Sequence, residues 1–237
     1  MHLPRLFSAS RPKTSGCLTV AIFLLGLLQP VVSQESNKVN LRFLSFPKAM
    51  KAVELELRLS ANKTEPIKAY SHEISQPISV VTSGVWSVGE TIENAEGKEV
   101  FVEYGRTAAT NSPRQLLLLI RKGTENSDGF DLVALDESGD AFSGGKFLFM
   151  NACKVDIAGV VGEEKFLVKP GTHQIIAPKT EADERHAHAM FYFRKGDEAR
   201  PFFSTRWAIN ERARSMIFFY HDPKNMRIRM HTVRDFR

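Results

Sequence analysis

Apolar and polar residues alternate with a period of two along much of this chain. The clearest example is residues 52–59 (AVELELRL), in which every second residue is apolar and Glu54, Glu56 and Arg58 stand between them. Successive side chains of a β-strand point to opposite faces, so this spacing predicts a strand with one buried and one wet face. A helix is the alternative, because Ala, Leu and Glu favour helices, but the apolar spacing is two rather than three or four.

Other short segments rich in Val, Ile, Leu and Phe are separated by Gly, Pro, Asn or Asp, which is typical of strands and turns. They are residues 39–46, 78–81, 99–104, 115–121, 130–135, 146–151, 155–161, 165–168, 172–177, 187–194, 201–209, 214–220 and 226–233. Residues 116–120 are consecutively apolar, which indicates a strand buried on both faces. About a dozen strands and no convincing helix predict an all-β protein, a β-sandwich with one continuous domain or two packed β modules. A single helical turn is expected within residues 179–185.

The N-terminus has the three parts of a secretory signal. Arg5, Arg11 and Lys13 precede an unbroken apolar run at residues 18–28, and Val-Val-Ser ends at Ser33. The run is shorter than the roughly 20 residues that span a bilayer, so we expect cleavage after Ser33. An uncleaved anchor is the alternative. The domains expected are therefore a signal peptide (1–33), an N-terminal β module (34–142) and an Arg-rich C-terminal β module (143–237), divided at the Gly-rich turn 136–145.

The predicted mature chain has one cysteine, Cys153, so it forms no intrachain disulfide. Cys153 is expected to be a buried apolar residue. No second long apolar run follows the signal, so no transmembrane span is expected in the mature chain. These features favour an exported protein of a bacterial periplasm or exterior.

One stretch supports this fold further. Residues 145–176, together with the opening VNLRFLSF, contain a strand that ends in Asn or Ser, a Val-rich hairpin and a Pro-Gly turn. In these features the chain resembles exported bacterial β-sandwich modules of unassigned function. Ser45 after LRFL and Asn151 after KFLFM also hint at an internal duplication. The resemblance implies a fold and no activity, site residue or cofactor.

Charge is distributed unevenly along the chain. Residues 34–184 contain 17 basic and 22 acidic side chains, whereas residues 185–237 contain 12 basic and 5 acidic ones, and ten of those 12 are Arg. Arginine beside aromatic residues binds phosphate, sulfate, carboxylate or acidic glycans. The candidate ligand-binding residues are Arg206, Arg212, Arg214, Arg227 and Arg229. The alternative is that these arginines are solvent-facing neighbours of core aromatics, or guard an edge strand.

His186 and His188 are two apart, so on a strand both imidazoles would share a face. With Asp183, Glu184 or a distant residue such as His173 they are candidate metal ligands. No HExxH, paired CxxC or fixed spacing to a third ligand accompanies them. Two ordinary histidines at an exposed strand start are the alternative.

No catalytic residue is identified, because the chain has no nucleophile elbow, P-loop or dinucleotide fingerprint. The sequence therefore predicts a non-enzymatic binding or structural accessory of the periplasm or cell envelope. Its expected partner is a protein or an anionic envelope polymer, not nucleic acid, and no cofactor is expected. A hydrolase acting on glycans or esters through scattered carboxylates, and a metal-binding β module, are the alternatives.

Overall fold

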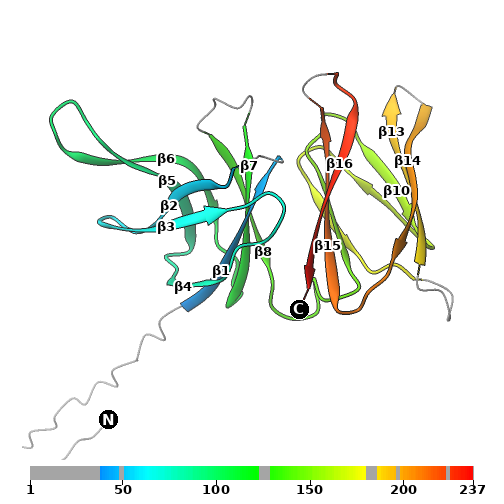
Figure 1. Ribbon diagram of the computed structural model, residues 1–237, viewed down its shortest axis with the longest axis horizontal. Helices are drawn as coiled ribbons and strands as arrows, with labels where there is room; N and C mark the ends of the chain where they lie inside the picture. Colours follow the sequence, from blue (N-terminus) through cyan, green and yellow to red (C-terminus); the bar gives the residue numbers. More distant parts are fainter. Residues whose placement is uncertain are drawn as a thin grey trace, which may run out of the picture. The chain divides into compact units, whose positions relative to one another are not determined.

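A computed structural model describes residues 38–47, 51–122, 129–179, 186–195, 198–222 and 225–236 (Figure 1). These residues form sixteen β-strands and no helix, which confirms the all-β prediction. The strands are β1 (Lys38–Phe46), β2 (Val53–Ser60), β3 (Lys63–Ala69), β4 (Ile78–Val81), β5 (Val85–Glu93), β6 (Glu99–Ala108), β7 (Arg114–Arg121), β8 (Phe130–Asp136), β9 (Phe147–Asn151), β10 (Ile157–Val161), β11 (Glu164–Val168), β12 (His173–Ile176), β13 (His186–Lys195), β14 (Glu198–Ala208), β15 (Ala213–His221) and β16 (Ile228–Phe236). Within this part of the chain, no helix has the length and apolarity needed to cross a membrane.

The strands form four sheets of four. Sheet A has the order β4-β1-β7-β8, sheet B β3-β2-β5-β6, sheet C β12-β9-β15-β16 and sheet D β11-β10-β13-β14. Sheets A and B contain only the first eight strands, here named the first module, and sheets C and D only the last eight, the second module. The expected boundary at residues 142 and 143 stays a prediction, and the predicted signal peptide and the helical turn at 180–185 lie outside the described residues.

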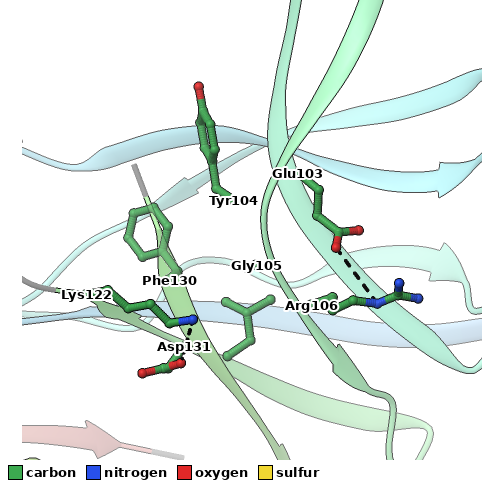
Figure 2. Close-up of a pocket in the computed structure, with 8 residues that line it drawn as sticks. Glu103, Tyr104, Gly105, Arg106, Lys122, Phe130 and Asp131 are labelled. Atoms are coloured by element: carbon green, nitrogen blue, oxygen red, sulfur yellow. Dashed lines mark ion pairs between the residues drawn. The ribbon is translucent and has the colours of Figure 1, made fainter. Parts of the chain in front are cut away.

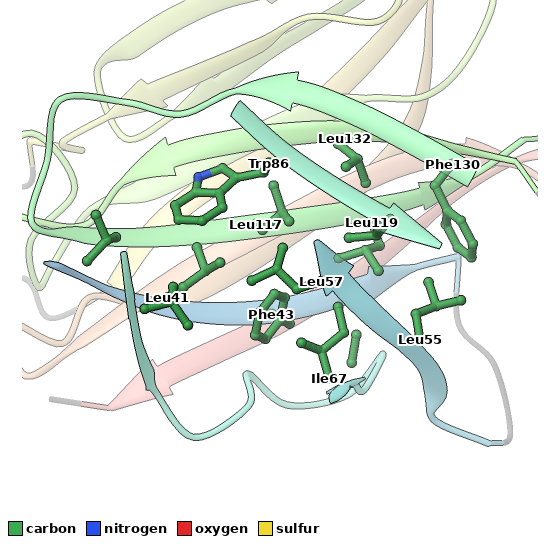
Figure 3. Packing of buried hydrophobic residues seen from close by; sticks show 14 residues of the cluster. Leu41, Phe43, Leu55, Leu57, Ile67, Trp86, Leu117, Leu119, Phe130 and Leu132 are labelled. Carbon is green, nitrogen blue, oxygen red and sulfur yellow. The ribbon is translucent and has the colours of Figure 1, made fainter. Parts of the chain in front are cut away.

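The first module is a sandwich because one face of sheet A packs on one face of sheet B. Its core combines Phe43 and Leu117 of sheet A with Leu57 and Trp86 of sheet B, all almost completely buried (Figure 3). The second module repeats this arrangement with an aromatic core, in which Phe149 of sheet C is stacked 4.3 Å from Phe166 of sheet D, centroid to centroid.

A third core lies between sheets A and C. It contains Leu116 and Leu118 of β7, Met216 and Phe218 of β15, and Phe142 from the connection between modules. Leu117 and Leu119, which alternate with the first two, belong to the core of the first module. The central strands β7 and β15 are therefore buried on both faces, and the prediction that the run at 116–120 is buried on both faces is confirmed for Leu116–Leu119.

The two modules have the same topology. Adding eight to each strand number of sheets A and B gives the order of sheets C and D, and the parallel pairing of β1 with β7 recurs between β9 and β15. A β-bulge also recurs: Tyr104 of β6 is the extra residue opposite Val88 and Gly89 of β5, and Phe202 of β14 is the extra residue opposite Phe191 and Tyr192 of β13. The hint of duplication in the sequence therefore corresponds to a repeated arrangement of strands.

Four charged side chains are brought together where sheets A and C meet. Arg42 of β1 donates from Nε and Nη2 to the two carboxylate oxygens of Glu137, at 2.9 and 2.7 Å, and from Nη2 to Asp235 at 2.8 Å. Arg214 of β15 donates from Nε to Asp235 at 2.9 Å, from Nη1 to the carbonyl of Phe142 at 3.2 Å, and from Nη2 to Glu137. We call Arg42, Glu137, Arg214 and Asp235 the buried quartet.

Pairing decides the charge state of the quartet. Burial alone would raise the pKa of Glu137 and of Asp235, but the hydrogen bonds and charges of Arg42 and Arg214 outweigh it and hold both pKa values below their usual range. The Arg214 side chain is completely buried, and its guanidinium lies 4.4 Å from the centre of the Phe142 ring. The quartet thus ties β1 and the end of β8 to β15 and β16.

We predict that Glu137→Ala lowers the free energy of unfolding by about 3–5 kcal/mol, because it leaves buried guanidinium charge without its partner. The matched control is Asp131→Ala, which removes an exposed carboxylate 3.0 Å from Lys122 and is expected to cost less than about 1 kcal/mol. Urea unfolding of both variants measures the difference. Equal losses would contradict a structural role for the quartet.

The quartet also predicts acid sensitivity. Because the folded-state pKa values of Glu137 and Asp235 lie below their ordinary values of 4.5 and 3.8, their contribution is complete above those values and is lost as the pH falls through the lower, folded-state pKa values. We expect the urea midpoint to fall as the pH drops below about 4.5, and to fall less steeply in Glu137→Gln. The same pH profile in both proteins would show that the acid effect originates elsewhere.

Candidate functional site

The five candidate arginines do not form one cluster. Arg212 precedes β15, whose first residue pairs with Phe236 at the end of β16, whereas Arg227 and Arg229 lie at the start of β16. Arg212 is therefore at the opposite end of the β15–β16 hairpin from the other two. Arg206 lies in β14 of sheet D, opposite His188.

The arginines also differ in accessibility. Arg214 belongs to the buried quartet and contributes nothing to an exposed face, while Arg206, Arg212, Arg227 and Arg229 are exposed. Arg229 lies 3.3 Å from Asp222, so part of its charge is compensated. Among the described residues no ion pair involves Arg206, Arg212 or Arg227. Arg234 of β16, an exposed arginine that the sequence analysis did not select, also has no ion pair among these residues.

His186 and His188 share the outer face of β13, where they alternate with buried Ala187 and Ala189. The hydroxyl of Ser204 lies 3.5 Å from Nε2 of His188. His173 lies in β12, which belongs to the other sheet of the module. No group of three His, Cys, Asp or Glu side chains that could hold a metal is present in the described ranges, and Asp183 and Glu184 lie outside them.

Cys153 is buried, as expected, and burial raises the pKa of its thiol to about 12. A nucleophilic cysteine must ionise near neutral pH. Cys153 remains protonated there and packs as an apolar side chain in the core of the second module.

A hollow of about 320 Å³ lies between β6 and β8 in the first module (Figure 2). Glu103 of its wall lies 3.9 Å from Arg106 and accepts a 2.6 Å hydrogen bond from Ser87, and Asp131 lies 3.0 Å from Lys122. Each carboxylate thus has its own basic partner. The hollow contains two separate ion pairs rather than two carboxylates facing a common point, so we identify no acid–base pair in it.

The edges of the two sandwiches differ at equivalent places. In the first module β6 lies against β8, and a Cβ atom on Gly105 would come within 2.6 Å of the carbonyl oxygen of Phe130 and 3.2 Å of Leu132. Gly105 pairs with Val88 and follows the bulged residue of β6, and Phe203 pairs with Phe191 and follows the bulged residue of β14. Phe203 therefore occupies the position where the first module has glycine.

The pairing register of sheets A and C shows which residue of β16 corresponds to Leu132 of β8. Ser45 pairs with Leu119, which pairs with Leu132, and the equivalent row of the second module is Asn151, Phe219 and Met230. Met230 thus corresponds to the leucine against which Gly105 packs. Within the described strands, β14 and β16 make no contact comparable to that of β6 with β8. A phenylalanine at position 203 fits this wider separation, because it needs room that glycine does not.

Strands β14 and β16 are thus the edges of sheets D and C, and in the described part of the second module they do not close on each other as β6 and β8 do; we call this the open side. The residues that face this side are partly buried or exposed, with Phe203 37% and Phe236 69% exposed. We define the open side by these residues: Phe203, Thr205 and Trp207 of β14, and Met230, Thr232, Arg234 and Phe236 of β16. The sequence analysis missed most of it; the adjacent Phe202 and Phe203, which interrupt the alternation of β14, were the available signal.

No protein-family model matches the sequence, and no curated protein matches it. The resemblance to exported bacterial β-sandwich modules stays a prediction.

We predict that Gly105→Ala destabilises the protein by about 1–3 kcal/mol, because the added methyl group forces β6 away from the carbonyl of Phe130. The matched control is Gly129→Ala, whose Cβ would meet only the flexible Lys122 side chain, at 3.4 Å. Thermal unfolding gives the stabilities, and hydrogen exchange should show faster exchange in β8. If the two variants were equally stable, Gly105 would not be what closes the first module.

Proposed function

We propose that this protein is an exported, non-enzymatic binding or structural accessory of the periplasm or cell envelope. Its second module contacts a protein or an anionic polymer. The observation that carries this proposal is the set of exposed arginines without an acidic partner in the described part of the chain: Arg206, Arg212, Arg227 and Arg234. Uncompensated guanidinium groups bind carboxylate, sulfate and phosphate through charge-assisted hydrogen bonds.

Charge distribution supports a contact through the second module. The last 53 residues contain 12 basic and 5 acidic side chains, while residues 34–184 have an excess of acids. An anionic partner is therefore attracted to one part of the chain and repelled by the other, which orients the encounter. Export from the cytoplasm, which the N-terminal pattern predicts, makes an envelope polymer or an envelope protein the relevant class of partner.

The test is retention of the purified protein on immobilised poly-L-glutamate across a salt gradient. The triple variant Arg206→Ser, Arg227→Ser and Arg234→Ser should elute at lower salt, with affinity reduced on the order of tenfold or more. The reason is that one charged hydrogen bond contributes roughly 1.5 kcal/mol, which is about tenfold in affinity.

The matched control removes the same charge from the first module through Lys38→Ser, Lys51→Ser and Lys63→Ser, all at exposed positions. This variant should elute like the parent protein. If both triple variants shift equally, retention reflects net charge alone and the second module is not the contact. If the parent protein is not retained at low salt, the proposal of an anionic partner fails.

A further inference from the structure

At the open side of the second module, core side chains are not fully covered by strands of that module. It is bordered by two edge strands, and apolar side chains that belong to the core, including Trp207 and Met230, are only partly covered there. The first module closes the equivalent side with its own strands, because Gly105 lets β6 approach β8. Partly exposed core side chains beside an edge strand can be covered by an added strand from another chain.

Of the two edges, β16 is the better template for an added strand. It pairs with β15 over nine consecutive residues without a bulge, from Ile228 to Phe236. In β14 the equivalent run is interrupted by the bulge near Phe202 and by Pro201, which has no N–H to donate. A partner strand therefore finds a regular row of backbone groups along β16 and an irregular one along β14.

The side chains around β16 indicate the chemistry of the partner. Met230 and Phe236 offer an apolar surface, with Phe203 and Trp207 on the facing strand. Exposed arginines stand near both ends of the strand, with Arg227 just before its start and Arg234 near its end. A matching segment has an apolar centre and acidic residues on both sides of it.

These charges also argue against a second copy of this chain as the occupant. Two β16 strands that paired edge to edge would gather Arg227, Arg229 and Arg234 of both copies along one seam. Like charges gathered in this way repel each other. Such arginines protect an edge from self-association while leaving it attractive to an acidic partner.

We propose that the open side accepts an extended segment of a partner protein, which adds as a β-strand along β16 and has an apolar centre flanked by acidic residues. Its backbone pairs with residues Ile228–Phe236, and alternate side chains fill the space between β14 and β16. The acidic residues meet Arg227 and Arg234. This inference rests on the proposed function, since it names the partner class and the binding mode of the same module.

The probe is a synthetic peptide of about eleven residues, the length of β16 plus one residue at each end, with a Val, Ile and Thr centre and two acidic residues at each end. Two further peptides separate the contributions. In one, alternate backbone nitrogens of the centre are methylated, which removes donors from the pairing edge. In the other, lysines replace the acidic residues.

We expect the acidic peptide to bind and to slow hydrogen exchange in β16, with no change in β6 or β8. The affinity of the N-methylated peptide and of the lysine peptide should each be lower by at least roughly tenfold. The first peptide loses the backbone pairing, and the second loses the charge complementarity. Arg234→Glu and Phe236→Glu should each weaken binding of the acidic peptide. The matched control is Leu167→Glu on β11, a 51% exposed apolar residue outside the open side, which should bind like the parent protein.

Equal binding of the acidic and N-methylated peptides would overturn strand addition while leaving the anionic contact intact. Failure of the acidic peptide to bind, with poly-L-glutamate retention preserved, would likewise overturn this inference and not the proposed function. Loss of both peptide binding and retention on poly-L-glutamate would count against the proposed function itself. If Leu167→Glu and Phe236→Glu lowered the affinity for the acidic peptide equally, the peptide would be binding exposed apolar surface in general and not the open side.

Discussion

The contact between sheets A and C depends on the pairing of Arg214 with Asp235 and Glu137. Apolar side chains such as Leu118 and Phe218 tolerate small displacements, because dispersion contacts are not directional. The completely buried guanidinium of Arg214 does not tolerate such displacements. A shift of one sheet over the other would separate it from Glu137 and Asp235, and burial keeps out the water that could replace these partners. The quartet therefore selects one alignment of the two modules, whereas burial of apolar surface supplies most of the driving force.

This requirement also changes how the charge of the chain is interpreted. The sequence shows an excess of arginine after residue 185, and the simplest interpretation assigns that excess to a single face. The fold instead uses Arg214 inside the molecule, and places Arg206 in sheet D and Arg227 just before β16 of sheet C. What remains outside is a smaller set around β14 and β16. Net charge predicts the sign of a partner, whereas the fold decides which of the charged side chains are exposed to solvent.

The strands that could be located from the sequence are those with a clear pattern of apolar residues. Alternation in residues 52–59 and the apolar run at 116–120 located β2 and β7 because burial fixes which positions are apolar. β3 and β5 were missed, because Pro66 interrupts the first and Gly89 lies in the middle of the second. Both residues have structural reasons: β3 is an edge strand that does not need every N–H, and a Cβ at Gly89 would clash with the carbonyl of Val102.

The candidate site was harder to predict, because it arises from a difference between two copies of one topology. Gly105 and Phe203 are unremarkable in sequence, and each becomes informative only after the register places both beside the same bulge. Glycine removes the side chain between two edge strands, so the first module can close upon itself. At the equivalent position the second module has Phe203, whose side chain is 37% exposed, and in the described strands β14 and β16 make no contact comparable to that of β6 with β8.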